Sequence, residues 1–144
     1  MLNEKEVLQG FQDGICCAMA VFGELSQDIG IEKETAYKIA AGFGSGVGYG
    51  CTCGCVTGAL MALGYRYGNC EPGQLDRKEL IKEKREAFQK EFLKRFGHLN
   101  CAEHLGNLNP TVPEERKIID ERGLMEKTCP PMVCAACELA REFL

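Results

Sequence analysis

The fold is decided by the stretch GCTCGCVTGALMALG, residues 50–64, in which a small residue recurs at every fourth position. Gly50, Gly54, Gly58 and Ala62 share one side of a helix, because residues four apart lie on the same face. A face almost without side chains lets a second helix approach closely. Larger apolar residues occupy the other side, namely Val56, Leu60, Met61 and Leu63. The stretch therefore predicts a central helix over 51–67 that is buried on most of its circumference.

Helical patterning continues on both sides of this segment, and no run alternates between polar and β-branched residues as a strand would. Apolar spacing, capping residues and terminal glycines predict further helices over 4–29, 33–41, 76–96, 100–105 and 111–122, and a last one from Thr128 through Phe143. Five alternating glycines make 42–50 a loop before the central helix. We expect one all-α domain over 1–144, a bundle of five to seven helices.

Composition and charge restrict the partners. The chain has 144 residues, a net charge of −4, and 21 acidic against 17 basic side chains, so we expect no nucleic-acid binding. The longest mainly apolar stretch, 51–65, is shorter than the roughly 20 residues of a membrane span, so we expect no membrane insertion. The opening residues are acidic and contain no apolar signal-peptide core, which favours the cytoplasm.

Cysteine is the unusual residue of this composition. Ten are present, at positions 16, 17, 51, 53, 55, 70, 101, 129, 134 and 137. In a reducing compartment, so many thiols are more often ligands, nucleophiles or redox partners than static bridges. Cys53, Cys101 and Cys129 fall in the first turn or so of predicted helices, where the helix dipole and free N–H groups favour thiolate. Cys17 is expected in the middle of the first helix, without that assistance.

His104 lies three residues after Cys101, on the same face of the predicted short helix. Its imidazole is either a base that keeps Cys101 ionised or a solvent-exposed polar group near a helix end, and the second reading is the more common one.

Several motifs resemble those of the C_GCAxxG_C_C family of small helical, redox-active proteins. They are CAMAV (17–21), AAGFGSGVG (40–48), CGCVTGALMALG (53–64), Cys101 before Leu105-Gly106, and Cys129-Pro130. The resemblance implies redox activity and four characteristic cysteines, which would be Cys17, Cys53, Cys101 and Cys129. The chain departs from the family pattern by having Cys55 where alanine is usual.

The C-terminal cysteines have the spacing Cys129-x4-Cys134-x2-Cys137, which three ligands of a plant-type iron–sulfur cluster share. Cys134 and Cys137 could also form half of a zinc site, a redox pair, or ordinary packing and surface residues. The cofactor therefore stays open between none, as for a dithiol, an iron–sulfur cluster and zinc.

We predict a cytoplasmic redox protein that uses clustered cysteines for thiol–disulfide or electron-transfer chemistry, a candidate thiol oxidoreductase. Cys53 would attack an oxidised donor and be resolved by Cys17, Cys101 or Cys129, with all four in one pocket and Cys70 apart. The partner would be a redox protein or a small thiol or disulfide, and a homodimer stays open. The alternatives are a metal or iron–sulfur module ligated by these four cysteines or by Cys134 and Cys137, and a non-catalytic helical interaction protein.

Overall fold

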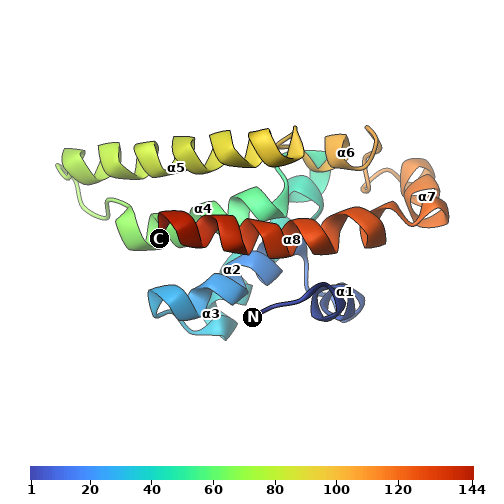
Figure 1. The fold of residues 1–144 in the computed structure, drawn as a ribbon, viewed down its shortest axis with the longest axis horizontal. Coiled ribbons are helices and arrows are strands. Elements are labelled where there is room, and N and C mark those ends of the chain that lie inside the picture. Colours follow the sequence, from blue (N-terminus) through green and yellow to red (C-terminus); the bar gives the residue numbers. More distant parts are fainter.

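The computed structural model describes residues 1–144 as a bundle of eight α-helices without strands (Figure 1). The helices are α1 (Glu4–Gln12), α2 (Cys17–Ile29), α3 (Lys33–Ala40), α4 (Gly54–Tyr67), α5 (Leu75–Phe96), α6 (Cys101–His104), α7 (Pro113–Arg122) and α8 (Leu124–Phe143). The all-α prediction is confirmed. The number of helices exceeds the expected five to seven because the predicted helix over 4–29 is two helices.

The break between α1 and α2 lies at 13–16. Gly14 adopts φ 91°, a left-handed conformation that glycine adopts readily, and the chain turns there. The amide of Ile15 donates to the carbonyl of Gly10 at 2.8 Å, which closes the end of α1. Cys17 is consequently the first residue of α2, and the expectation that it lies mid-helix is wrong.

The small-residue face of α4 packs against α2. A Cβ added at Gly54 would lie 2.5 Å from the amide nitrogen of Ala18 and 2.8 Å from the Cβ of Cys17. At Gly58 it would lie 2.8 Å from the carbonyl oxygen of Ala18. The close approach predicted from the four-residue spacing is confirmed, and it places the start of α2 beside the start of α4.

Helices α5 and α8 run antiparallel along the bundle and cover α4 (Figure 1). Phe88 and Phe92 of α5 and Leu139 of α8 are fully buried in the main core. Helix α8 begins at Leu124 rather than at Thr128, and Pro130 and Pro131 lie inside it. Cys129 is therefore in the second turn of a continuous helix, and the expectation of a first-turn position is wrong.

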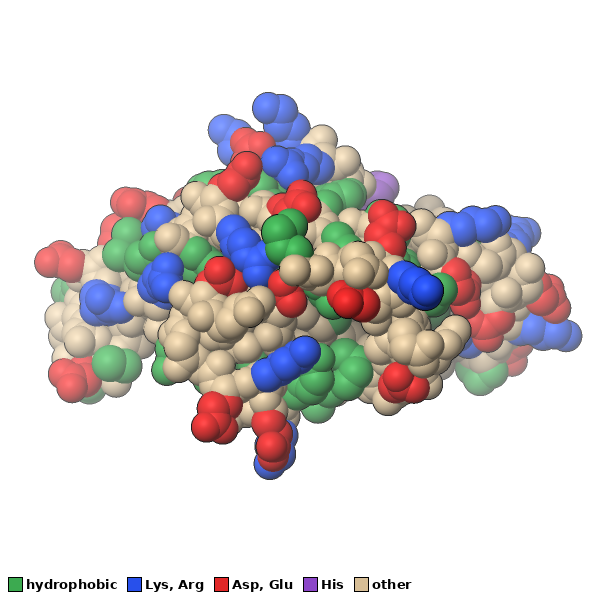
Figure 2. Space-filling view, turned by 60° about the horizontal axis from the view of Figure 1, so that its bottom comes forward, with side chains coloured by type: hydrophobic (Ala, Val, Ile, Leu, Met, Phe, Trp, Pro, Cys, Tyr) green, Lys and Arg blue, Asp and Glu red, His purple; other side chains and the backbone are tan.

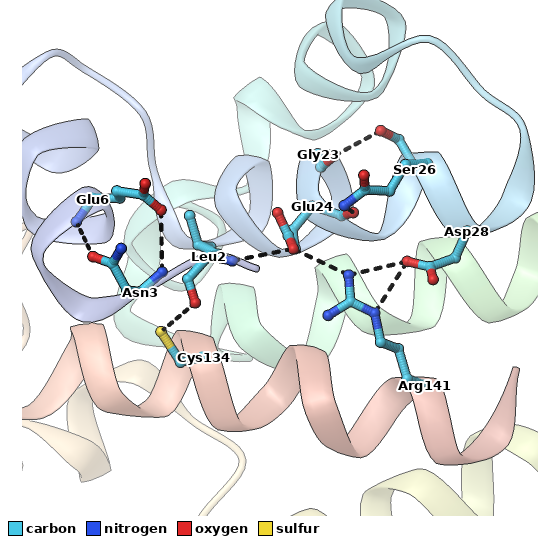
Figure 3. Close-up of polar contacts among 10 residues, drawn as sticks. Leu2, Asn3, Glu6, Gly23, Glu24, Ser26, Asp28, Cys134 and Arg141 are labelled. Carbon is cyan, nitrogen blue, oxygen red and sulfur yellow. Dashed lines mark hydrogen bonds and ion pairs between the residues drawn. The ribbon is translucent and has the colours of Figure 1, made fainter.

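An ion-pair cluster fastens α8 to α2 (Figure 3). The guanidinium of Arg141 lies 3.1 Å from carboxylate oxygens of both Glu24 and Asp28. Glu24 also accepts a hydrogen bond from the amide of Leu2, at 3.3 Å. This cluster holds the two helices that carry Cys17 and Cys129 in a fixed relation.

Acidic and basic side chains are interspersed on the face in Figure 2, with small apolar areas between them. None of the helices combines the length and the apolar character needed to cross a bilayer.

Candidate active site: a cavity lined by cysteines

A cavity of about 210 Å³ opens where α1, α2, α6 and α8 meet the start of α4. Five cysteines line it, namely Cys16, Cys17, Cys53, Cys101 and Cys129. The rest of the wall is largely apolar and includes Phe11, Ile15, Leu105, Pro110, Met125 and Met132. The structure thus brings the four family-motif cysteines into one cavity, while Cys70 is exposed between α4 and α5.

An isolated pair of extended residues joins the two loops that carry Cys53 and Cys101. Thr52 and Asn100 form an antiparallel bridge, in which the amide of Cys53 donates to Leu99 at 2.7 Å and the amide of Cys101 donates to Cys51 at 2.6 Å. The bridge holds the two loops together, with Cys53 opposite Leu99 and Cys101 opposite Cys51, although 48 positions separate Cys53 from Cys101 in the sequence. No periodic pattern in the sequence predicts this bridge.

The glycine-rich loop supplies another part of the wall through Ser45 and Gly46. Residues 45–48 all have positive φ, from 53° at Ser45 to 76° at Gly48, so the backbone makes a left-handed turn there. A Cβ at Gly46 would lie 2.9 Å from the Cβ of Cys101, which explains why glycine is needed at this position.

Cys17 lies at the centre of a network of thiols. Hydrogen bonds from the Cys129 and Cys55 thiols hold the pKa of Cys17 well below its usual value, although burial acts in the opposite direction. Its own amide, at the start of α2, also stabilises the thiolate. Cys17 is thus the cysteine whose surroundings favour the charged form, because several donors converge on its sulfur.

The neighbouring cysteines are held as thiols. Donation to Cys17 raises the pKa of Cys129, and burial adds to this effect. The pKa of Cys55 is raised well above its usual value by its hydrogen bonds with Cys17 and Cys53. Burial raises the pKa of Cys101 to about 12. The site therefore combines a cysteine whose surroundings favour thiolate with three neighbours whose surroundings favour the thiol.

Cys53 occupies the cap position before α4, close to the helix start that was predicted for it. It lines the cavity, but only 4% of its surface is exposed. The expectation that the glycine-rich loop leaves its thiol open to attack from solvent is therefore wrong.

Cys55 is the cysteine whose part in the site the sequence did not indicate. It is fully buried in the second position of α4 and hydrogen-bonds to both Cys17 and Cys53. The sequence does distinguish Cys55, because it stands where the resemblance leads us to expect alanine. Its neighbours could not be predicted, because they depend on the packing of α2 against α4.

His104 is half-buried and lines the cavity, so it is not the exposed polar residue that was favoured from the sequence. Burial lowers its pKa, with a further contribution from His98. Its Nε2 is buried and has no hydrogen-bond partner. A neutral imidazole with a free nitrogen therefore lies next to the cysteine cluster.

The remaining cysteines lie outside this network. Cys51 is exposed, and Cys16 is half-buried with a thiol directed to the carbonyl oxygen of Ala40 at 3.9 Å. Cys134 donates to the carbonyl of Leu2 at 3.6 Å (Figure 3), and burial raises the pKa of Cys137 to about 12. Cys134 and Cys137 lie on a continuous helix away from the cavity. No three His, Cys, Asp or Glu side chains are arranged to hold a metal ion.

Comparison with known proteins identifies the family. No curated protein and no solved structure matches the chain. Residues 15–143 match the family described as "Putative redox-active protein (C_GCAxxG_C_C)". The matched range includes Cys17, Cys53, Cys101 and Cys129, each of which lines the cavity. The chain therefore belongs to the C_GCAxxG_C_C family.

Proposed function

We propose that this protein is a thiol oxidoreductase in which Cys17 is the nucleophile and Cys129 the resolving cysteine. The observation that carries the proposal is that Cys17 and Cys129 line one cavity, where the Cys129 thiol lowers the pKa of Cys17. A thiolate is the reactive form of cysteine, and the surroundings of Cys17 favour that form. This assignment replaces Cys53 as the attacking residue, because the surroundings of Cys17 are the ones that favour thiolate.

The chemistry requires two electrons for each cycle. The Cys17 thiolate attacks an oxidised donor, and its sulfur becomes covalently modified or oxidised. The Cys129 thiol then gives up its proton and attacks the Cys17 sulfur, which forms the disulfide and releases the reduced group. In total, the Cys17 thiolate and the Cys129 thiol lose two electrons to the donor and release one proton.

The cavity favours this pairing over one with Cys55, because Cys17 and Cys129 both line the cavity and Cys55 does not. A disulfide requires the two sulfurs to approach to about 2.0 Å. Cys53 and Cys101 line the same cavity as the pair. Cys55 supports the thiolate from the buried side.

The test is controlled oxidation of the reduced protein with diamide, followed by peptide mapping of disulfides. We expect the loss of two thiols and a Cys17–Cys129 linkage. Cys17→Ala and Cys129→Ala should each abolish that linkage, whereas Cys70→Ala, which alters an exposed cysteine outside the cavity, should leave it intact.

A first disulfide that excludes Cys17, or ten thiols that stay free under conditions that oxidise small dithiols, would contradict the proposal. The second outcome would favour the helical interaction protein.

A further inference from the structure

Two cysteines that do not belong to the proposed pair of Cys17 and Cys129 lie opposite each other beside the cavity. The amide of Cys101 donates to the carbonyl of Cys51 at 2.6 Å. A Cβ built on Gly46 would lie 2.6 Å from the carbonyl oxygen of Cys51 and 2.9 Å from the Cβ of Cys101. The two cysteines are therefore neighbours in space, although 50 positions separate them in the sequence.

This arrangement is close to the one that a disulfide requires. Directly opposed residues of an antiparallel pair have Cβ atoms about 4.5–5.5 Å apart, and a disulfide requires about 3.5–4.5 Å. The thiol of Cys51 is directed to the carbonyl of Tyr49 at 3.8 Å, a long contact that a rotation of the side chain would break. That rotation, with an approach of the two Cβ atoms by about 1 Å, would allow the sulfurs to bond.

The two cysteines differ in their access to solvent. Cys101 is half-buried and lines the cavity together with Cys17 and Cys129. Cys17 and Cys101 also pack against the small buried cluster that contains Cys129. Cys51, in contrast, is exposed and is not part of the cavity wall. The pair of Cys51 and Cys101 therefore connects the cavity to the outer surface.

Such a connection meets a requirement of the catalytic cycle. The disulfide between Cys17 and Cys129 must be reduced before the next cycle can begin. Cys129 is only 7% exposed, so a thiol carried by another protein has little access to its sulfur. Resting on the proposed function, we propose that Cys51 and Cys101 form a second disulfide, which takes over the oxidation of the Cys17–Cys129 pair and presents it to a dithiol protein at the surface.

The transfer is a thiol–disulfide exchange in two steps. The Cys101 thiol loses its proton and attacks the Cys129 sulfur, the bond between Cys129 and Cys17 breaks, and Cys17 leaves as thiolate. The Cys51 thiol then loses its proton and attacks the Cys101 sulfur, and Cys129 leaves and takes up a proton. One disulfide replaces another, so the protein neither gains nor loses electrons, and one proton is released.

The direction of this transfer agrees with the surroundings of the cysteines. A disulfide is a stronger oxidant when its reduced form contains a stabilised thiolate. The surroundings of Cys17 favour its thiolate, whereas burial favours the thiol of Cys101. The Cys17–Cys129 disulfide should therefore oxidise Cys51 and Cys101 rather than the reverse.

The experiment follows the two disulfides over time after one equivalent of diamide is added to the reduced protein. Samples are quenched with acid, alkylated and mapped as peptides. We expect the Cys17–Cys129 disulfide first, and then its conversion to Cys51–Cys101 until the second disulfide exceeds the first. Cys51→Ser should keep the Cys17–Cys129 disulfide. Cys70→Ser, which alters the other exposed cysteine, should behave as the native protein does.

One further variant distinguishes transfer from direct oxidation of the exposed thiol. In Cys17→Ala, Cys51–Cys101 should form at least tenfold more slowly than in the native protein, because the disulfide that would supply the oxidation cannot form. An equal rate would mean that diamide oxidises Cys51 directly, and the transfer would be wrong.

The outcomes separate this inference from the proposed function. If the native protein forms Cys17–Cys129 but never Cys51–Cys101, the transfer is wrong and the thiol oxidoreductase stands. If no Cys17–Cys129 disulfide appears, even in Cys51→Ser, the proposed function itself fails. The native time course needs no variant, so it does not depend on the folding of any substituted chain.

Discussion

Cys17, the first residue of α2, and Cys129, in the second turn of α8, line the same cavity, and the Cys129 thiol lowers the pKa of Cys17 while its own pKa is raised. The two cysteines therefore differ in acidity within one cavity. Such an asymmetry is what a nucleophile and a resolving thiol require. It depends on the helix break at 13–16, because without that break Cys17 would lack the free amides of a helix start.

Removing the donor should make Cys17 less acidic. In Cys129→Ala the pKa of Cys17 should rise, because a hydrogen bond to a charged group is worth about 1.5–3 kcal/mol. Below both pKa values, the thiolate fraction should fall by roughly 10- to 100-fold. The more basic thiolate is a better nucleophile, so alkylation should slow by only about 3- to 10-fold. Iodoacetamide kinetics against pH, with Cys17 followed by peptide mass spectrometry, measure this change.

Cys134→Ala is the matched control, since Cys134 lies on the same helix but donates to Leu2 instead of Cys17. Its alkylation profile for Cys17 should match that of the native protein. An unchanged profile in Cys129→Ala would mean that the hydrogen bond does not set the acidity of Cys17.

The glycines of α4 should differ in their tolerance of alanine. Gly58→Ala places a methyl group 2.8 Å from the carbonyl oxygen of Ala18, so α2 must move, and the free energy of unfolding should fall by about 1–3 kcal/mol. Gly64 lies on the same helix with no atom within 4 Å of the added Cβ. Gly64→Ala should raise stability by about 0.5–1 kcal/mol, because alanine restricts the unfolded chain. Urea denaturation of both variants compares these effects, and equal losses in the two would refute the packing explanation.

The four-residue spacing of small residues was sufficient to predict the centre of the fold. It identified α4, its close neighbour and the all-α class, because helix packing depends on a local, periodic pattern. The break before α2 was missed since Gly14 interrupts an apolar period that otherwise runs through it. The start of α8 was missed because Pro130 and Pro131 resemble a helix beginning, whereas here the helix continues through them.

The site was predictable in its members but not in their roles. The family motif named the four cysteines, and the cavity contains all of them. Which sulfur accepts and which donates depends on contacts between α2, α4 and α8, and these join positions more than 30 residues apart. The place of Cys55 in the network and the burial of His104 arise from the same long-range packing.

The left-handed turn at the cavity should contain strain that glycine relieves. Val47 has φ 57° and ψ 35°, which costs a β-branched residue about 1–2 kcal/mol, and its side chain is 45% exposed. Val47→Gly should therefore leave stability unchanged or raise it by up to about 1 kcal/mol, after the entropy cost of glycine. Ile39→Gly removes a similarly exposed β-branched residue from right-handed helix α3 and should lower stability. Thermal unfolding of the pair tests the sign, and a loss in Val47→Gly as large as in Ile39→Gly would count against strain.

His104 should make the stability depend on pH. Its pKa in the fold is lowered by burial, so below about pH 6.5 the unfolded chain binds a proton that the folded protein resists. More protons on the unfolded state mean that stability rises with pH, and thus falls as the pH decreases from 6.5 toward the pKa of folded His104. His104→Gln should lose this component, whereas His98→Gln should retain it. Urea denaturation between pH 7.5 and 5.5 measures the slopes, and identical slopes in all three proteins would refute the assignment.

Cys55 is the alternative to Cys129 as the cysteine that forms a disulfide with Cys17. Its thiol donates to Cys17 from the buried side, so Cys17 has a second sulfur within hydrogen-bond contact. Because Cys55 is fully buried in the second position of α4 and is absent from the cavity wall, we expect it to stabilise the thiolate without forming the first disulfide. Cys55→Ala should keep the Cys17–Cys129 linkage after diamide treatment and slow the alkylation of Cys17 less than Cys129→Ala does. A Cys17–Cys55 disulfide as the first product in the native protein would reverse the two roles, with Cys55 as the resolving thiol and Cys129 as the supporting donor.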